Sequence, residues 1–210
     1  MTESPAALTV RARTAYHHGD LRAQMIAAVR DLVETHGPDG FSVAEAARRA
    51  GVSSAAPYKH FKDRAEILRG VVGEAMDRLR TAMETGAATY PAGSVEAVAA
   101  VGLAYISFAR TEPGVFRLSF GLTEGHENDP DLQAKGERTF DVVVRCAAAC
   151  LGLPPEDRHV QTCAYMLWCF VHGLSFLTID NKRSTADARI DDWTYLLTAA
   201  RAILGQPVRG

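Results

Sequence analysis

The chain contains few cysteines, and their pattern excludes two classes of protein. Its four cysteines, Cys146, Cys150, Cys163 and Cys169, all lie in the last third of 210 residues. A disulfide scaffold would need a higher density, and a zinc site would need closely spaced pairs with matching partners. We interpret the four as buried thiols in a reducing compartment, with a redox-sensing pair as the alternative.

The sequence also lacks a long uninterrupted hydrophobic run. Arg, Glu or His interrupts each apolar stretch before it reaches the roughly 20 residues that span a membrane. The first 16 residues carry Arg11 and Arg13 but no apolar stretch, so they do not resemble a secretory signal. These features predict a cytoplasmic protein that does not contact a membrane.

Motifs for catalysis and metal binding are missing as well. The chain has no glycine-rich phosphate loop, no nucleophile elbow and no metal-binding His-Glu helix. His126, His159 and the carboxylates are scattered, without a base beside a nucleophile. The sequence therefore predicts neither an enzyme nor a protein that holds a cofactor or a metal.

What the sequence does contain is ordinary globular composition. Hydrophobic residues make up 47% of the chain and charged residues 23%, and the net charge is −2. A disordered chain has fewer apolar residues and a higher net charge, so a folded core is expected. The first 70 residues carry a mild excess of basic residues. This leaves nucleic-acid binding open, since the distribution of charge matters more than its sum.

Apolar residues recur every three or four positions along most of the chain, and no alternating strand pattern of useful length is present. This spacing is typical of amphipathic helices and predicts an all-α fold. The stretch from Gly121 to Asp131 is expected to be a loop, because it contains Gly125 and Asn128-Asp129-Pro130. The expected helices cover residues 21–36, 43–50, 53–61, 64–85, 94–110, 113–120, 132–151, 155–177 and 190–204.

Two of these helices, joined by Ala50-Gly51-Val52-Ser53, form a helix-turn-helix pattern. Ser42 and Glu45 are spaced as a capping box at the start of the first helix, and Asp20 and Asp63 are expected to cap the helices over 21–36 and 64–85. Proline is tolerated only in a first turn, so Pro57 prevents the second helix from beginning much before Ser53. The residues expected on the exposed face of that helix, suited to a major groove and its phosphates, are Ser54, Ala55, Tyr58, Lys59 and Lys62.

The stretches YHHGDLR at 16–22 and FSVAEAARRAGVSSAAPYKHFKDRAEIL at 41–68 closely resemble the DNA-binding domain of the tetracycline-repressor (TetR) family. Pro57 departs from many members but is similar to a subgroup with Ala-Ala-Pro-Tyr. The resemblance implies DNA contacts at Ser42, Ser53, Ser54, Ala55, Tyr58, Lys59, His60 and Arg64, to which the expected helical face adds Lys62.

The resemblance also implies the organisation and action of the protein. It implies a tail (1–15), a DNA-binding domain (16–78) and a helical ligand-binding and dimerisation domain (79–210). It further implies a homodimeric regulator that responds to a ligand. Such a regulator would be a repressor that a small molecule releases from a palindromic operator. The dimer would form through the helices near 155–177 and 190–204. The segment 164–179 is apolar nearly all round, which independently favours burial by a second subunit.

Trp168, His172 and Gly173, together with Tyr105 and the stretch 113–117, are similar to one C-terminal subclass of the family. A mostly apolar ligand pocket is one interpretation, and a core of aromatic residues with a hydrogen-bonded histidine is the other. Arg117 would meet an anion, or pair with Glu112 or Glu124. The predicted pocket consists of Tyr105, Phe108, Phe116, Phe120, Phe140, Tyr165, Trp168 and His172.

Three alternatives remain open from sequence. The N-terminal tail, with Arg11, Arg13, Tyr16, His17 and His18, is either a solvated end or an arm that reaches an adjacent minor groove. The helix-turn-helix is either functional or the vestige of one in a protein that binds small molecules. An architectural DNA binder with little sequence preference is disfavoured by the modest basic charge.

Overall fold

The computed structural model describes residues 21–121, 129–183 and 191–205. In these ranges the secondary structure is entirely helical, as the periodicity predicted. The elements are α1 (Leu21–His36), α2 (Val43–Arg49), the 3₁₀ helix η1 (Pro57–Lys59), α3 (Arg64–Ala87), α4 (Val95–Thr111), α5 (Pro113–Phe120), α6 (Pro130–Leu151), α7 (Arg158–Ile179) and α8 (Asp192–Ile203).

Short polar side chains start most of these helices. Ser42 Oγ accepts a hydrogen bond from the Glu45 backbone N–H at 3.1 Å, and Asp63 accepts one from Glu66 at 2.7 Å. Each bond satisfies a backbone donor that has no partner inside its helix. The caps predicted at Ser42 and Asp63 are thus confirmed. The same role falls to Ser94, Asp129, Asp157 and Asp191.

Two of the predicted elements differ from the structure. The helix expected over 53–61 is reduced to turns and η1, because Pro57 has no N–H to donate and the next bonds are of the i to i+3 kind. Pro130, expected within a loop, is instead the first residue of α6, a position where proline costs no hydrogen bond. The expected cap Asp20 and most of the expected loop over 121–131 lie outside the described residues.

The buried residues form two clusters. One contains residues of α1, α2 and the first half of α3, as far as Met76, and the other begins at Leu79 in the second half of α3. The predicted domain boundary at 78/79 therefore falls inside a continuous helix. Two residues from beyond that boundary, Val115 and Leu118 of α5, belong to the first cluster.

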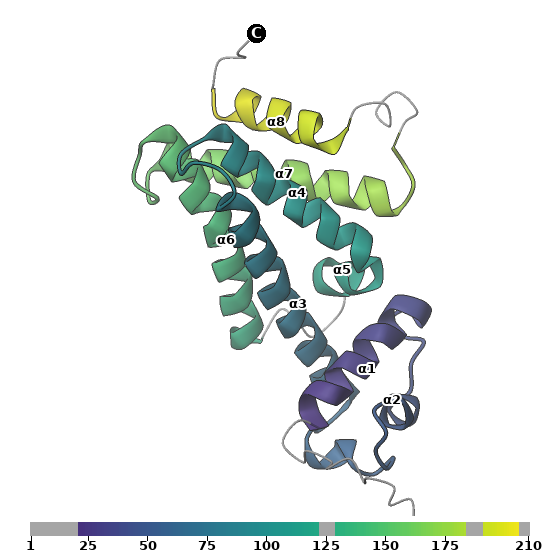
Figure 1. The fold of residues 1–210 in the computed structure, drawn as a ribbon. Helices are drawn as coiled ribbons and strands as arrows, with labels where there is room; N and C mark the ends of the chain where they lie inside the picture. The colour runs from purple at the N-terminus through teal and green to yellow at the C-terminus, as the bar shows by residue number, and fades with distance from the viewer. Residues whose placement is uncertain (1–20, 122–128, 184–190, 206–210) are drawn as a thin grey trace, which may run out of the picture.

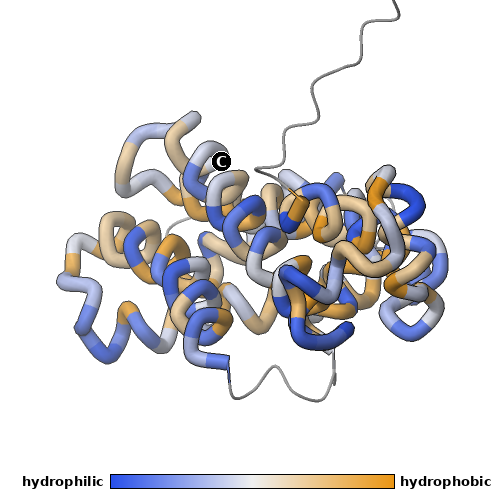
Figure 2. The backbone as a smooth tube through the Cα atoms, turned by 90° about the horizontal axis from the view of Figure 1, so that it is seen from below, coloured by the Kyte–Doolittle hydropathy of each residue, from blue (hydrophilic) through white to orange (hydrophobic). Residues whose placement is uncertain are grey.

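Figure 1 shows the resulting arrangement, with α1, α2 and the 3₁₀ turn at one end and α7 and α8 at the other. Helix α3 runs between the two ends and contacts α1, α4, α5 and α6. The hydropathy tube of Figure 2 shows hydrophobic and hydrophilic residues alternating in short runs along the helices. This alternation is the pattern by which each helix buries one stripe and exposes the other.

Helix α7 is long and rich in apolar residues. Among the described residues, only this helix is long and apolar enough to cross a membrane. It packs against α4, α6 and α8, however, so much of its apolar surface belongs to the core. All four cysteines are free thiols, but Cys146 and Cys150 are half-buried and Cys169 on α7 is exposed, so the interpretation of buried thiols is confirmed for Cys163 alone.

Candidate nucleic-acid interface and ligand cavity

The first candidate site is the surface formed by the start of α2 and the turn that ends in η1. Gly51 adopts a positive φ of 71°, which lets the chain reverse after α2. Val52 packs against the adjoining core. Pro57 and Phe61 are buried, and they fix the turn to the domain beneath it.

The predicted DNA-binding residues of this turn are on the surface. Ser53, Ser54, Ala55, Lys59, His60 and Lys62 are exposed. Tyr58 has 66% of its surface exposed, which is the largest value among the exposed large hydrophobic residues in the described part of the chain. A large apolar ring gains nothing from lying in water, so its exposure beside lysines indicates a surface that meets a partner.

Two arginines pack against buried aromatic rings beneath this surface and hold its segments in place. The Arg64 guanidinium lies 4.5 Å from the centre of the Phe41 ring and donates to the Pro38 carbonyl oxygen. Arg22 lies 5.3 Å from the centre of the Phe61 ring. Arg64, predicted at DNA, is therefore also a structural residue that holds the segment before α2 against α3.

The second candidate site is a cavity of about 490 Å³ between α3, α4, α6 and α7, to whose wall α5 contributes Phe120. Its wall is mainly aromatic and aliphatic, and its size lies within the usual range for small-molecule sites. The lining residues are Met76, Met83, Tyr105, Phe120, Gln133, Gly136, Glu137, Thr139, Phe140, Val143, Tyr165 and Trp168.

Five of the eight predicted pocket residues line this cavity: Tyr105, Phe120, Phe140, Tyr165 and Trp168. Phe108, Phe116 and His172 are not among the lining residues. Phe116 is fully buried, and Phe108 packs between the two cores. Sequence reasoning missed Met76 and Met83, because their spacing signals only a buried helical face, and it also missed the α6 residues other than Phe140.

His172 does not line the cavity but holds Tyr105, which does. Its Nδ1 atom shares a hydrogen bond of 2.9 Å with the Tyr105 hydroxyl, and five aromatic rings, that of Tyr105 included, surround the imidazole. Burial raises the pKa of Tyr105 and lowers the pKa of His172. Both shifts favour the uncharged form. The inner wall of the cavity is therefore neutral at pH 7.

A joint between α1 and α5 links the two candidate sites. The half-buried Glu34 carboxylate at the end of α1 accepts hydrogen bonds from the backbone N–H groups of Gly114 (2.9 Å) and Val115 (2.7 Å). A Cβ atom on Gly114 would lie 2.7 Å from the Val33 carbonyl oxygen, so only glycine allows this approach. One α1 side chain thus caps the helix that carries Phe120.

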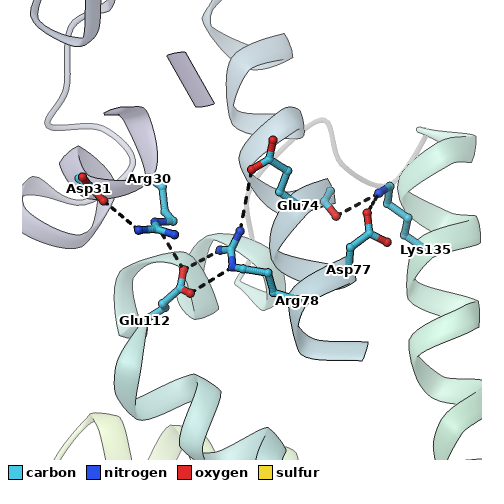
Figure 3. A network of polar contacts seen from close by, with 8 residues as sticks. Arg30, Asp31, Glu74, Asp77, Arg78, Glu112 and Lys135 are labelled. Carbon is cyan, nitrogen blue, oxygen red and sulfur yellow. Dashed lines mark hydrogen bonds and ion pairs between the residues drawn. The ribbon is translucent and has the colours of Figure 1, made fainter. Parts of the chain in front are cut away.

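Ion pairs reinforce this joint (Figure 3). Arg78 of α3 donates to both carboxylate oxygens of Glu112, at 2.7 and 3.3 Å, and Arg30 of α1 lies 4.0 Å from the same group. Lys135 of α6 pairs with Asp77 of α3. Arg117, for which an anion, Glu112 or Glu124 was expected, pairs with Asp180 at 2.8 Å, and Glu124 lies outside the described residues.

Comparison with known families and structures supports this geometry. Residues 25–71 match the model of bacterial regulatory proteins of the tetR family, and residues 98–200 match a tetracyclin repressor-like C-terminal domain. Together these matches span most of the chain. No curated protein matches the chain.

The chain is similar to a solved protein of unknown function from Rhodococcus sp. RHA1, at 24% identity and a TM-score of 0.76, over 92% of this chain and 98% of that one. It is also similar to a tetR-family regulator from Streptomyces coelicolor, at 17% identity and a TM-score of 0.69, over 88% of this chain and 80% of that one. The TetR family regulator PfmR from Thermus thermophilus is similar at 17% identity and a TM-score of 0.59, over 89% of this chain and 100% of that one. These likenesses concern the fold. With the two family matches, they lead to one conclusion: the chain belongs to the TetR family of DNA-binding transcriptional regulators, which are not enzymes.

Proposed function

We propose that this protein is a homodimeric repressor that a small apolar ligand releases from a palindromic operator. The observation that carries the proposal is the exposed Tyr58 ring beside Lys59 and Lys62, on a turn anchored by buried Pro57 and Phe61. This turn presents small residues, a phenol and cations to a groove while its backbone stays fixed. The proposed DNA contacts are Ser42, Ser53, Ser54, Ala55, Tyr58, Lys59, His60, Lys62 and Arg64.

The proposed dimer forms through α7 and α8. Met166 and Leu177 of α7 have 48% and 47% of their surfaces exposed, and Cys169 lies between them on the exposed side of the helix. A second copy would remove this apolar surface from water. Two-fold symmetry would then place two DNA-binding turns about one helical turn of DNA apart, roughly 34 Å.

The proposed ligand site is the cavity between α3, α4, α6 and α7. A ligand that prefers one arrangement of the two subunits shifts the dimer away from the arrangement that DNA prefers, so the two bind antagonistically. Helix α3 carries this coupling, since its two halves belong to the two cores. The Glu34 cap and the Arg78–Glu112 pair couple α5 to the same movement.

The proposed division of labour follows from these sites: DNA binding by residues 16–78, and ligand binding and dimerisation by residues 79–210. The proposed place of action is the cytoplasm. The tail over 1–15 lies outside the described residues. Deletion of residues 1–13 tests its role, because a minor-groove arm would add affinity and steepen the dependence of binding on salt.

Selection of random double-stranded DNA on the purified protein at physiological salt tests the proposal. We expect a palindrome with a fixed half-site spacing, and no enrichment with Tyr58→Ala. Leu153→Ala is the matched control, since Leu153 is also an exposed apolar residue but lies in the turn before α7, outside the DNA-binding turn and outside α7 and α8. Failure of the folded wild-type protein to enrich any sequence would contradict specific DNA binding.

A second measurement tests the release mechanism separately. Once an operator and a ligand are in hand, operator affinity is titrated at increasing ligand concentration. Antagonism predicts that the apparent operator affinity falls and then levels off at a limit set by the coupling. Independent binding of the two would contradict the mechanism and leave DNA binding intact.

A further inference from the structure

The charge of the cavity wall indicates which ligands it accepts. Glu137 of α6 is the one charged side chain among the described residues that line the cavity. In the described part of the chain no cation pairs with it. Neither basic residue beside Glu137 in the α6 sequence lines the cavity: Lys135 binds Asp77 and the Gly73 carbonyl oxygen, and Arg138 is exposed. An anionic ligand would therefore lose its hydration without meeting a positive charge.

Three aromatic side chains, those of Phe140, Tyr165 and Trp168, line the same cavity as this carboxylate. Phe140 follows Glu137 by three residues on α6, which places both on one side of the helix. The Trp168 ring lies 5.9 Å from the Phe140 ring and 5.8 Å from the Tyr165 ring, at angles of 64° and 59°. Tilted rings offer π faces from several directions, and π faces beside a carboxylate are the surroundings that bind ammonium groups.

The other described residues that line the cavity are uncharged. Met76, Met83 and Phe120 line it, and the Tyr105 hydroxyl is already hydrogen-bonded to His172. Such a wall favours an apolar body, while Glu137, which is exposed, marks the side that opens to water. The site thus combines a neutral interior with one carboxylate at its edge.

From this arrangement we propose that the cavity binds lipophilic monocations. The cationic group lies against Glu137 and the rings of Phe140, Tyr165 and Trp168, and the apolar body fills the space between α3 and α5. This inference extends the proposed function by naming the class of effector. Binding itself does not depend on DNA, so it is tested apart from operator binding.

The test uses three probes with one phenylhexyl body and a trimethylammonium, hydroxyl or carboxylate end. Trp193→Phe leaves Trp168 as the only tryptophan of the two in the chain, so its fluorescence reports on the cavity. We expect the ammonium probe to bind about tenfold more tightly than the alcohol, and the carboxylate to bind most weakly.

Glu137→Gln tests the role of the carboxylate. It should remove most of the preference for the ammonium probe and leave the affinity for the alcohol unchanged. Glu156→Gln is the matched control, because Glu156 is exposed in the turn before α7, and it should retain the preference. Three outcomes would each overturn the inference. They are binding of the alcohol as tight as that of the cation, an unchanged preference for the ammonium probe in Glu137→Gln, and no binding of the cation. Operator selection on the same preparation shows whether the proposed function fails with it.

Discussion

At the scale of single residues, Lys62 isolates the electrostatic part of DNA binding. Its side chain is exposed, whereas its backbone N–H is held by the Glu66 carboxylate at 2.8 Å. Lys62→Ala should therefore remove a charge without moving the turn. We expect weaker binding to all DNA sequences and a fall of about one in the slope of log affinity against log salt. Lys182→Ala, with 68% of that side chain exposed beyond α7, should leave the slope unchanged. An unchanged slope for Lys62→Ala would show that this lysine does not contact a phosphate.

His172 makes stability depend on pH. Burial lowers its pKa in the folded protein below the value of about 6.5 for an unfolded chain. Below that value the unfolded chain takes up a proton that the folded protein resists, so the free energy of unfolding falls as the pH drops from about 7.5 to about 5.5. Urea unfolding at several pH values measures this fall.

The His172→Gln variant should show a smaller fall over this pH range, even if its stability at the upper end of the range is lower because the contact with Tyr105 is lost. His60→Gln serves as the control, since His60 is exposed, and should keep the full dependence. If His172→Gln also kept the full pH dependence of stability, that dependence would arise from another group.

At the scale of elements, the start of α5 depends on a single side chain of α1. Glu34→Gln leaves one oxygen to accept the two hydrogen bonds from Gly114 and Val115, and it directs an NH₂ group at a backbone donor. We expect a loss of about 1 to 3 kcal/mol in the free energy of unfolding, measured by urea denaturation. Asp31→Asn, on an exposed side chain of the same helix, should cost far less. Equal losses in the two variants would show that the Glu34 cap stabilises the fold no more than an exposed carboxylate does.

The elements also show how far the sequence could predict the structure. The caps at Ser42 and Asp63 depend on neighbouring residues, and such local signals were sufficient. The cap on α5 joins residues 80 positions apart, so no local pattern reveals it. The same holds for the cavity: aromatic residues indicated Trp168 and Phe140, whereas Met76 and Met83 resemble any buried methionine. The helix expected over 53–61 failed because one proline weakens a short helix more than its capping residues strengthen it.

At the scale of the whole molecule, a dimer would explain the exposed apolar surface of α7. Met166→Glu places a charge in the middle of that surface, where burial against a second copy would leave it without a partner. We expect a dimer for the wild-type protein and a monomer for the variant in sedimentation velocity. Operator affinity should fall at least about a hundredfold, because each half-site is then bound without the effective concentration that linkage to the other provides.

Leu153→Glu is the control for this experiment. Leu153 lies in the turn before α7 and has 38% of its surface exposed, close to the 48% of Met166, so the two variants add the same charge at comparably exposed apolar residues. The control should remain a dimer and keep its operator affinity. If Met166→Glu also remained a dimer, the two copies would have to meet elsewhere. The spacing of the two DNA-binding turns would then follow from another face, and the half-site spacing recovered by selection would be the measurement that locates it.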